Sequence, residues 1–194
     1  HGKDSRRLLH LLRLGFDMVH FDGSSLDYSQ NLSQTAEFVA AAKSIRPDCL
    51  IEAEFNRINL VDSQISPDSF TQPSQAAEFV AKTGADLLAV SIGNLHGVSQ
   101  KSAETINLDL LSQIKSALPQ QFFTLHGGSG ISSDQLNSAI SMGVVKININ
   151  TDLRHQFFQS LKANLSQYSG DKIYQFLDPV ITDLKSVIKS KFHV

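Results

Sequence analysis

Histidine is followed by glycine at three places in the sequence, and this repetition suggests a metal site. The pairs begin at His1, His96 and His126, and the last two follow apolar stretches of strand-like composition. Three neutral imidazoles on separate loops can bind one zinc ion and leave a fourth position open for substrate, which is typical of catalytic zinc sites. Each histidine taken alone is better explained as a polar loop residue. Their occurrence in three matching pairs favours the metal site.

A glycine-rich turn follows the third histidine directly. Residues 127–130 read "GGSG" and lead into helix-like sequence, so their backbone N–H groups would lie at the positive end of a helix, where phosphates bind. The next strand-like stretch ends in "NINTD", with the short polar side chains of Asn148, Asn150 and Thr151. Phosphate sites at two late strand ends recur in barrel enzymes. One small molecule that carries a carbonyl and a phosphate would explain why a metal ligand and a phosphate turn adjoin.

Carboxylates also gather where strands are expected to end. Asp22 and Glu54 each occupy such a position, and Glu52 lies two residues before Glu54, so both glutamates point to one face of their strand. A sheet covered on both faces buries paired carboxylates only with a cation or hydrogen-bond partners. A second metal position and a structural network are therefore both compatible with the pattern.

The remaining histidines and the single cysteine carry weaker signals. His10 falls in helix-like sequence and is expected to face solvent or a neighbouring helix, and His155 and His193 fall in exposed helical sequence. His20 lies within a strand, where a buried structural role is favoured over metal ligation. Cys49 has no partner for a disulfide and is interpreted as a small, half-buried packing residue.

The elements that must position these residues follow a repeating order of amphipathic helix, glycine, apolar strand and polar loop. Gly15, Gly84 and Gly143 fall where helices should end, because glycine accepts the left-handed conformation common there. Asn107 and either Ser132 or Ser133 are predicted helix N-caps. The five predicted strands lie within residues 16–25, 49–55, 85–97, 122–128 and 144–152, and the sequence beyond 152 is helical with a break at "SGD".

Alternating strands and helices predict a parallel sheet with right-handed crossovers. The short, apolar and β-branched strands agree with a sheet covered on both faces. Five such units form either a complete open, doubly wound sheet or part of an eight-stranded barrel, and periodicity does not choose between the two.

Composition is that of an ordinary globular domain. The 194 residues are 41% hydrophobic and 19% charged, which is enough for one domain with a substantial core. A net charge of −2 without a dense Lys/Arg run argues against nucleic acid or an anionic membrane as partner. No apolar stretch approaches the roughly 20 residues that span a bilayer, and no signal peptide is visible. A cytoplasmic location is the expectation.

With these residues assembled, the sequence resembles the class II, zinc-dependent fructose-bisphosphate aldolases, including the tagatose-bisphosphate branch. The matching stretches occur in order, extend to about residue 160, and read "HGKD", "GFDMVHFDGSSL", "IEAEF", "EFVAKTGADLLAVSIGNLHG", "LHGGSGIS" and "GVVKININTDLR". The resemblance implies an α/β fold, a (β/α)8 TIM barrel that is incomplete here. Residues 1–194 would form a single domain, with barrel units for strands four to eight in 1–152 and C-terminal helices in 153–194.

The resemblance also implies roles for individual residues. His1, His96 and His126 correspond to the ligands of the catalytic Zn²⁺, and Asp22 and Glu54 to carboxylates of a second metal site. Gly97, Gly127, Gly128 and Ser129 correspond to the phosphate-binding loops, where the family also uses a monovalent cation, Na⁺ or K⁺. Asn148, Asn150 and Thr151 correspond to the segment that contacts the dihydroxyacetone phosphate portion of the substrate. The substrate would be a ketose 1,6-bisphosphate, fructose or tagatose, and the assembly a homo-oligomer, either dimer or tetramer.

Several departures from the family pattern bear on activity. The family's general acid/base is an aspartate directly before the first zinc-binding histidine, a position that precedes His1, and three barrel strands would also lie upstream. We therefore expect this chain alone to be inactive. The family's glycine-rich loop after "EAE" reads "FNRINL" here, and Asn94 and Leu95 replace two small hydroxyl residues before His96. The missing aspartate and the altered "FNRINL" loop motivate a rival hypothesis, a non-catalytic barrel remnant that binds metal or phosphate or serves only as an interaction surface.

Overall fold

The computed structural model describes residues 1–56, 58, 69–95, 105–170 and 172–192. Within these ranges, five parallel strands form one sheet in the order β1-β2-β3-β4-β5. Their bounds are β1 (Met18–Asp22), β2 (Leu50–Glu54), β3 (Leu87–Val90), β4 (Phe122–Leu125) and β5 (Val144–Ile147). Every predicted strand is present, and each pairs in parallel with the next one in the sequence.

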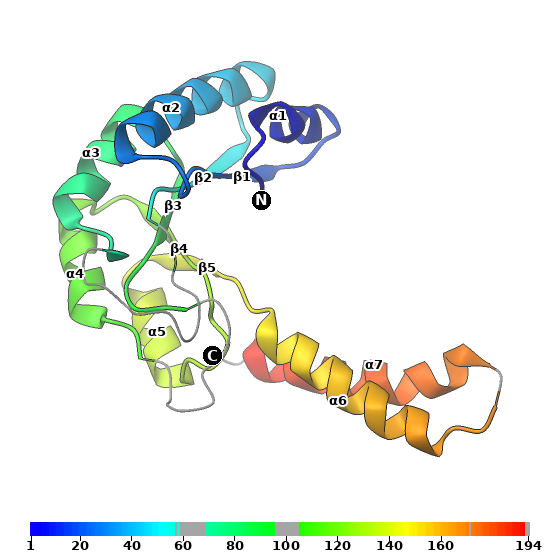
Figure 1. The fold of residues 1–194 in the computed structure, drawn as a ribbon. Helices are drawn as coiled ribbons and strands as arrows, with labels where there is room; N and C mark the ends of the chain where they lie inside the picture. Colours follow the sequence, from blue (N-terminus) through cyan, green and yellow to red (C-terminus); the bar gives the residue numbers. More distant parts are fainter. Residues whose placement is uncertain (57, 59–68, 96–104, 171, 193–194) are drawn as a thin grey trace.

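Helices alternate with the strands along the chain. They are α1 (Ser5–Arg13), α2 (Tyr28–Ile45), α3 (Pro73–Thr83), α4 (Leu108–Ala117), α5 (Ser133–Ser141), α6 (Thr151–Gln167) and α7 (Ile173–Lys191). Helices α2 to α5 follow one another in an arc along one side of the sheet (Figure 1). Sequential strand order with helices on one side is the arrangement of a β/α barrel, whereas a doubly wound sheet reverses its strand order and carries helices on both faces. The described residues thus form part of a barrel, as the resemblance implied.

The expected helix signals are confirmed. Gly84 ends α3 at φ 68°, and Gly143 follows α5 at φ 99°, conformations in which a side chain would be strained. The side chain of Asn107 accepts a hydrogen bond from the backbone N–H of Leu110 at the start of α4. Ser132 rather than Ser133 caps α5.

Two apolar clusters fill the space between the sheet and the helices. The larger joins the middle strands to α3, α4 and α5 and contains Phe79 and Phe123, and the smaller joins β1 to α1 and α2 and contains Leu12 and Phe38. Cys49 is 0% exposed within the smaller cluster. It is more deeply buried than the sequence suggested, and its role as a packing residue is unchanged.

The C-terminal part is a pair of packed helices. Helix α6 begins at Thr151, two residues before the predicted start of the C-terminal helices, and α7 follows the break at "SGD". The hairpin projects away from the sheet (Figure 1). It exposes large apolar side chains, including Phe157, Phe158, Ile173 and Tyr174. None of the helices in the described ranges is long and apolar enough to cross a membrane.

Candidate metal and phosphate site

The polar side chains of β1 and β2 occupy the face of the sheet opposite the helices. Val19 and Phe21 pack in the smaller apolar cluster, so the alternation of strand side chains turns His20 and Asp22 the other way. Strand β2 follows the same rule, and its glutamates point to the same face. Register places His20 beside Glu52 and Asp22 beside Glu54 on the neighbouring strand.

His1 is held beside these residues by the backbone. The Gly2 N–H donates to the His20 carbonyl at 3.0 Å, and the Asp22 N–H donates to the Gly2 carbonyl at 2.9 Å. These bonds form an isolated parallel bridge between Gly2 and Phe21. The first residue therefore lies along the edge of β1, where its imidazole reaches the carboxyl end of the strand.

Three imidazoles gather at this end of the sheet. The ring centroids of His1 and His126 are 5.9 Å apart, and His20 lies 4.3 Å from His1 and 5.1 Å from His126. Two members of the predicted zinc triad thus come together, while His96, and Gly97 beside it, lie outside the described residues. From the sequence, a buried structural role is favoured for His20. Its position two residues before Asp22, which places both side chains on one strand face, was the signal that it belongs to this cluster.

The fully buried Glu52 forms a network with His126, which directly follows β4, and with the partly exposed Lys146 of β5. His126 Nε2 lies 2.8 Å from Glu52 Oε1, and Lys146 Nζ donates to Glu52 Oε2 at 2.7 Å. Burial opposes ionisation of this carboxyl, but the His126 hydrogen bond, the nearby His20 and Lys146 outweigh it and lower the pKa of Glu52 to about 2. Glu52 is therefore a carboxylate whose charge protein groups already balance, and Lys146 acts as its partner.

Asp22 is satisfied in a similar way. The Ser24 backbone N–H and hydroxyl donate to Oδ1 at 3.0 and 2.6 Å, and His1 Nε2 lies 3.2 Å from Oδ2. Burial alone would raise the pKa of Asp22, but hydrogen bonds from His1 and Ser24 lower it well below its ordinary value. The hydrogen bond to Asp22 in turn raises the pKa of His1, although burial opposes this.

A buried asparagine joins the end of β3 to the third histidine. Asn94 is 1% exposed, and its amide nitrogen donates to the His126 carbonyl at 2.9 Å while its amide oxygen accepts from the Ile92 N–H at 2.9 Å. The two loops approach so closely that a Cβ on Gly127, at φ 65°, would lie 1.8 Å from the Leu95 carbonyl oxygen. Asn94, which replaces a small hydroxyl residue of the family pattern, thus has a structural role, because its side chain fixes the backbone of His126, a predicted metal ligand.

The glycine-rich turn is fixed to the next strand end and to α6. The Gly128 N–H donates to the Asn148 carbonyl at 2.9 Å, and the hydroxyl of the buried Ser129 accepts from the Asp152 N–H at 3.2 Å. Asn148 and Thr151 are partly buried nearby, and Asn150 is exposed. The structure therefore brings the two predicted phosphate segments together, but it uses the Gly128 N–H for an internal bond.

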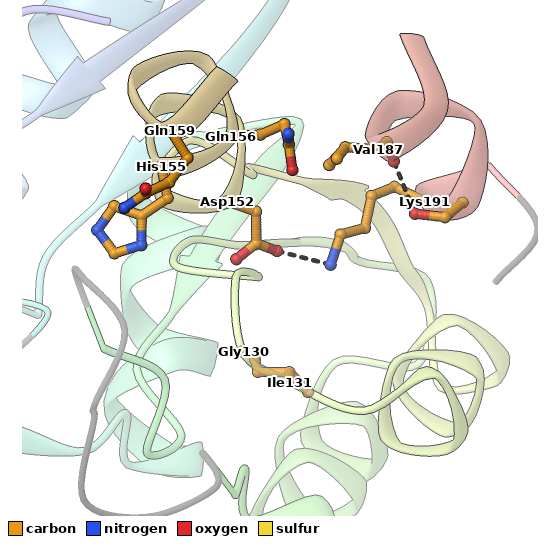
Figure 2. A pocket seen from close by; sticks show the side chains of 9 residues that line it. Gly130, Ile131, Asp152, His155, Gln156, Gln159, Val187 and Lys191 are labelled. Atoms are coloured by element: carbon orange, nitrogen blue, oxygen red, sulfur yellow. Dashed lines mark hydrogen bonds and ion pairs between the residues drawn. The ribbon is translucent and has the colours of Figure 1, made fainter. Parts of the chain in front are cut away.

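A cavity of about 510 Å³ opens between this turn and the two C-terminal helices. Gly130, Asp152, His155 and Lys191 are among the residues that line it, and Figure 2 shows the Asp152 and Lys191 side chains pointing toward each other across it. Lys191 Nζ lies 2.6 Å from Asp152 Oδ2. Sequence reasoning did not identify this ion pair, which connects α7 to the first turn of α6.

Barrel strands with histidines and carboxylates at their carboxyl ends, beside a glycine-rich turn, define an α/β-barrel protein with a candidate metal and phosphate site. The sequence matches the class II fructose-bisphosphate aldolase family over residues 1–194. The chain belongs to this family.

Comparison with individual proteins agrees with this assignment. The chain is 33% identical to the fructose-bisphosphate aldolase of Streptococcus pyogenes over 198 aligned residues, which cover 96% of this chain and 66% of that protein. It is 32% identical to the fructose-bisphosphate aldolase of Streptococcus pneumoniae over the same shares of the two chains. The crystal structure of the YdjI aldolase from Escherichia coli K12 covers the whole chain with a TM-score of 0.82 at 29% identity, and the chain covers 66% of it. The chain thus spans about two thirds of the length of these relatives.

Proposed function

We propose that the protein that carries this chain is a zinc-dependent aldolase that reversibly cleaves a ketose 1,6-bisphosphate into dihydroxyacetone phosphate and glyceraldehyde 3-phosphate. The observation that carries the proposal is the convergence of His1 and His126, with ring centroids 5.9 Å apart, beside buried carboxylates and the glycine-rich turn. Family membership supports it. Cytoplasmic sugar-phosphate metabolism is the setting that we propose.

The donor set fits a zinc ion. Imidazole nitrogen is a preferred ligand of Zn²⁺, and we propose His1, His96 and His126 as the three ligands. A bound zinc would supply Lewis-acid chemistry by polarising the ketone carbonyl of the sugar phosphate. Asn94 would orient His126 through its backbone carbonyl, and Glu52 would fix the His126 ring through Nε2. We keep Asp22 and Glu54 as the proposed carboxylates of a second metal position.

The rest of the site would bind and orient the substrate. We propose that the turn around Gly127, Gly128 and Ser129, with Gly97, binds the phosphate, and that a monovalent cation, Na⁺ or K⁺, assists there. Because the Gly128 N–H is engaged with Asn148, Gly128 would shape the turn while its neighbours contact the phosphate. Asn148, Asn150 and Thr151 would contact the dihydroxyacetone portion. We assign proton transfer to the aspartate that the family carries before the first histidine, so this chain alone is expected to be inactive.

The test measures zinc content and aldol cleavage by the full-length protein, with fructose and tagatose 1,6-bisphosphates as alternative substrates. We expect about one tightly bound zinc and turnover of at least one substrate. His126→Ala should abolish turnover and weaken zinc binding, because one ligand of the three-histidine site is lost, whereas the exposed His155→Gln should change neither. Circular dichroism of each variant checks folding. Zinc bound as tightly by a folded His126→Ala variant as by the unaltered protein would contradict the ligand assignment. Metal or phosphate binding without cleavage of either sugar would instead favour the non-catalytic remnant.

We also propose that the protein is a homo-oligomer, a dimer or tetramer. Support comes from the α6–α7 hairpin, which exposes the adjacent side chains of Phe157 and Phe158 at 42% and 61%. Exposed apolar patches of this kind mark association surfaces. Sedimentation velocity of the full-length protein should show the assembly, and Phe158→Ser should shift it toward monomer. A monomeric unaltered protein would contradict the proposal.

A further inference from the structure

His20 is the one histidine of the cluster whose described surroundings leave it without a hydrogen bond. It is 4% exposed, and among the described residues neither ring nitrogen has a hydrogen-bond partner. Its Nδ1 lies 3.4 Å from Glu52 Oε1, and its Nε2 lies 3.3 Å from Glu54 Oε2. A buried imidazole whose two nitrogens both face carboxylates requires a further partner, one that binds a ring nitrogen and offsets the negative charge of the carboxylates.

Glu54, like His20, is buried without a close partner for its side chain among the described residues. Its side chain is nearly fully buried, and within the described part of the chain its nearest charged or ionisable neighbours are His20 at 3.3 Å and His126 Nδ1 at 3.7 Å. Glu52, on the same strand face, instead has two close partners at 2.8 and 2.7 Å. Removing a carboxylate from water without such partners is strongly unfavourable. Glu54 is therefore the acceptor in this cluster that a cation would satisfy.

The spacing of these donors matches a small metal ion. Ligands of a tetrahedral zinc site lie about 2.0–2.1 Å from the ion, which separates neighbouring ligand atoms by roughly 3.4 Å. The 3.3 Å between His20 Nε2 and Glu54 Oε2 is close to that separation. A donor atom of His1 completes the set, since the three ligand atoms of His1, His20 and Glu54 all lie within 4.8 Å of one another. Small side-chain rotations would close the remaining gaps.

We propose that His1, His20 and Glu54 form a second cation site with two nitrogen ligands and one oxygen ligand. This set differs from the Asp22–Glu54 pair, because His20 takes the place of Asp22, whose Oδ1 already accepts two hydrogen bonds from Ser24. Mixed imidazole and carboxylate ligands select borderline transition metals such as Zn²⁺ or Co²⁺ over Mg²⁺ and Ca²⁺. The inference deepens the proposed function and shares only His1 with the proposed three-histidine site.

The experiment isolates this site by disabling the other one. Full-length protein with His96→Ala lacks a ligand of the proposed three-histidine site but keeps His1, His20 and Glu54. Co²⁺ is titrated into it, followed by calorimetry and visible absorption. We expect about one Co²⁺ bound, and His96→Ala/His20→Gln should bind it at least about 100-fold more weakly, because a direct ligand is lost. His96→Ala/His10→Gln is the matched control, since His10 is an exposed histidine on α1, and it should bind as His96→Ala does.

The outcomes separate the two proposals. If His96→Ala binds no Co²⁺, or if His20→Gln leaves the titration unchanged, the second site is wrong while the three-histidine site stands. Because the two sites share His1, the count of bound ions does not separate them; if unaltered protein binds Co²⁺ with the same affinity and the same absorption spectrum as His96→Ala, the three-histidine site is wrong while the second site stands.

A second measurement avoids any change at His20, in case His20→Gln does not fold. Crystals of the unaltered protein grown with Zn²⁺ are examined by anomalous diffraction at the zinc edge. We expect a peak about 2.0–2.1 Å from His20 Nε2. A map with zinc at other histidines and no density beside His20 would overturn the proposal.

Discussion

Replacing Asn94 tests whether the loop after β3 is anchored to the third histidine. In the Asn94→Ala variant, the His126 carbonyl loses its donor and the Ile92 N–H loses its acceptor. Both groups lie at a position where Asn94 is 1% exposed, so bulk water does not replace the lost bonds directly. The change therefore removes one buried hydrogen bond from each of these two backbone groups.

The expected loss of stability follows from those two groups. Removing the partner of a buried donor or acceptor destabilises the folded state by up to about 1–3 kcal/mol, so the two losses together give at most about 2–6 kcal/mol. A water molecule that enters the space left by the amide would recover part of this loss. We therefore expect Asn94→Ala to lower the free energy of unfolding by about 2–4 kcal/mol. Asn94→Asp keeps the acceptor for Ile92 but faces the His126 carbonyl with a buried negative charge, so its loss should be at least as large.

Urea unfolding followed by circular dichroism measures the effect, provided that the slope of the transition is unchanged. The matched control is Asn137→Ala, which removes the same amide from an exposed position in α5 and should change stability by no more than about 0.5 kcal/mol. If Asn94→Ala costs no more than the control, the bond to His126 does not hold the loop, and the positioning role assigned to Asn94 is wrong.

Two further predictions concern α2 and the C-terminal hairpin. Burial, with Glu78 nearby, raises the pKa of Tyr28 from 10.0 to about 12, so its stabilising contribution is complete below pH 10 and is lost as the pH rises toward 12. Ultraviolet titration should show a late tyrosine ionisation that Tyr28→Phe removes, and an identical curve in the variant would contradict this. Lys191→Met breaks the partly exposed ion pair to Asp152 and should lower the unfolding free energy by about 1 kcal/mol or less at low salt and by less at high salt. The exposed Lys162→Met in α6 is its control, and an equal loss in both variants would show that the ion pair contributes nothing.

The elements of the fold could be predicted because their signals are local. Apolar β-branched runs, glycines at helix ends and polar N-caps each act within a few residues, and the strands, Gly84 and Asn107 follow them. The choice between barrel and open sheet could not be made from these signals, because it depends on strand order, which is a long-range property. Resemblance to a family decided it before the sheet order confirmed it.

The site was predictable in its residue types and only partly in its contacts. His1 and His126 come together as the pattern of His-Gly pairs suggested, while His96, Gly97 and half of the "FNRINL" loop lie outside the described residues. The pairing of His20 with Glu52 depends on the register between β1 and β2, and a shift of one residue would turn His20 to the other face. The bond between Asn94 and His126 joins residues 32 positions apart, and no local pattern encodes it.

Glu52 and Glu54 look equivalent in the sequence, but the structure gives their carboxylates different partners. Their spacing of two places both carboxylates on one face, and the sequence alone left a structural network and a metal position open for the pair. Lys146 comes from β5 and reaches only Glu52, which it binds together with His126. Glu54 lies at the end of the strand, beyond the reach of that lysine contact, with His20 as its nearest ionisable neighbour. The two alternatives therefore apply to different members of the pair: Glu52 belongs to the structural network, and Glu54 is the carboxylate that we assign to a cation.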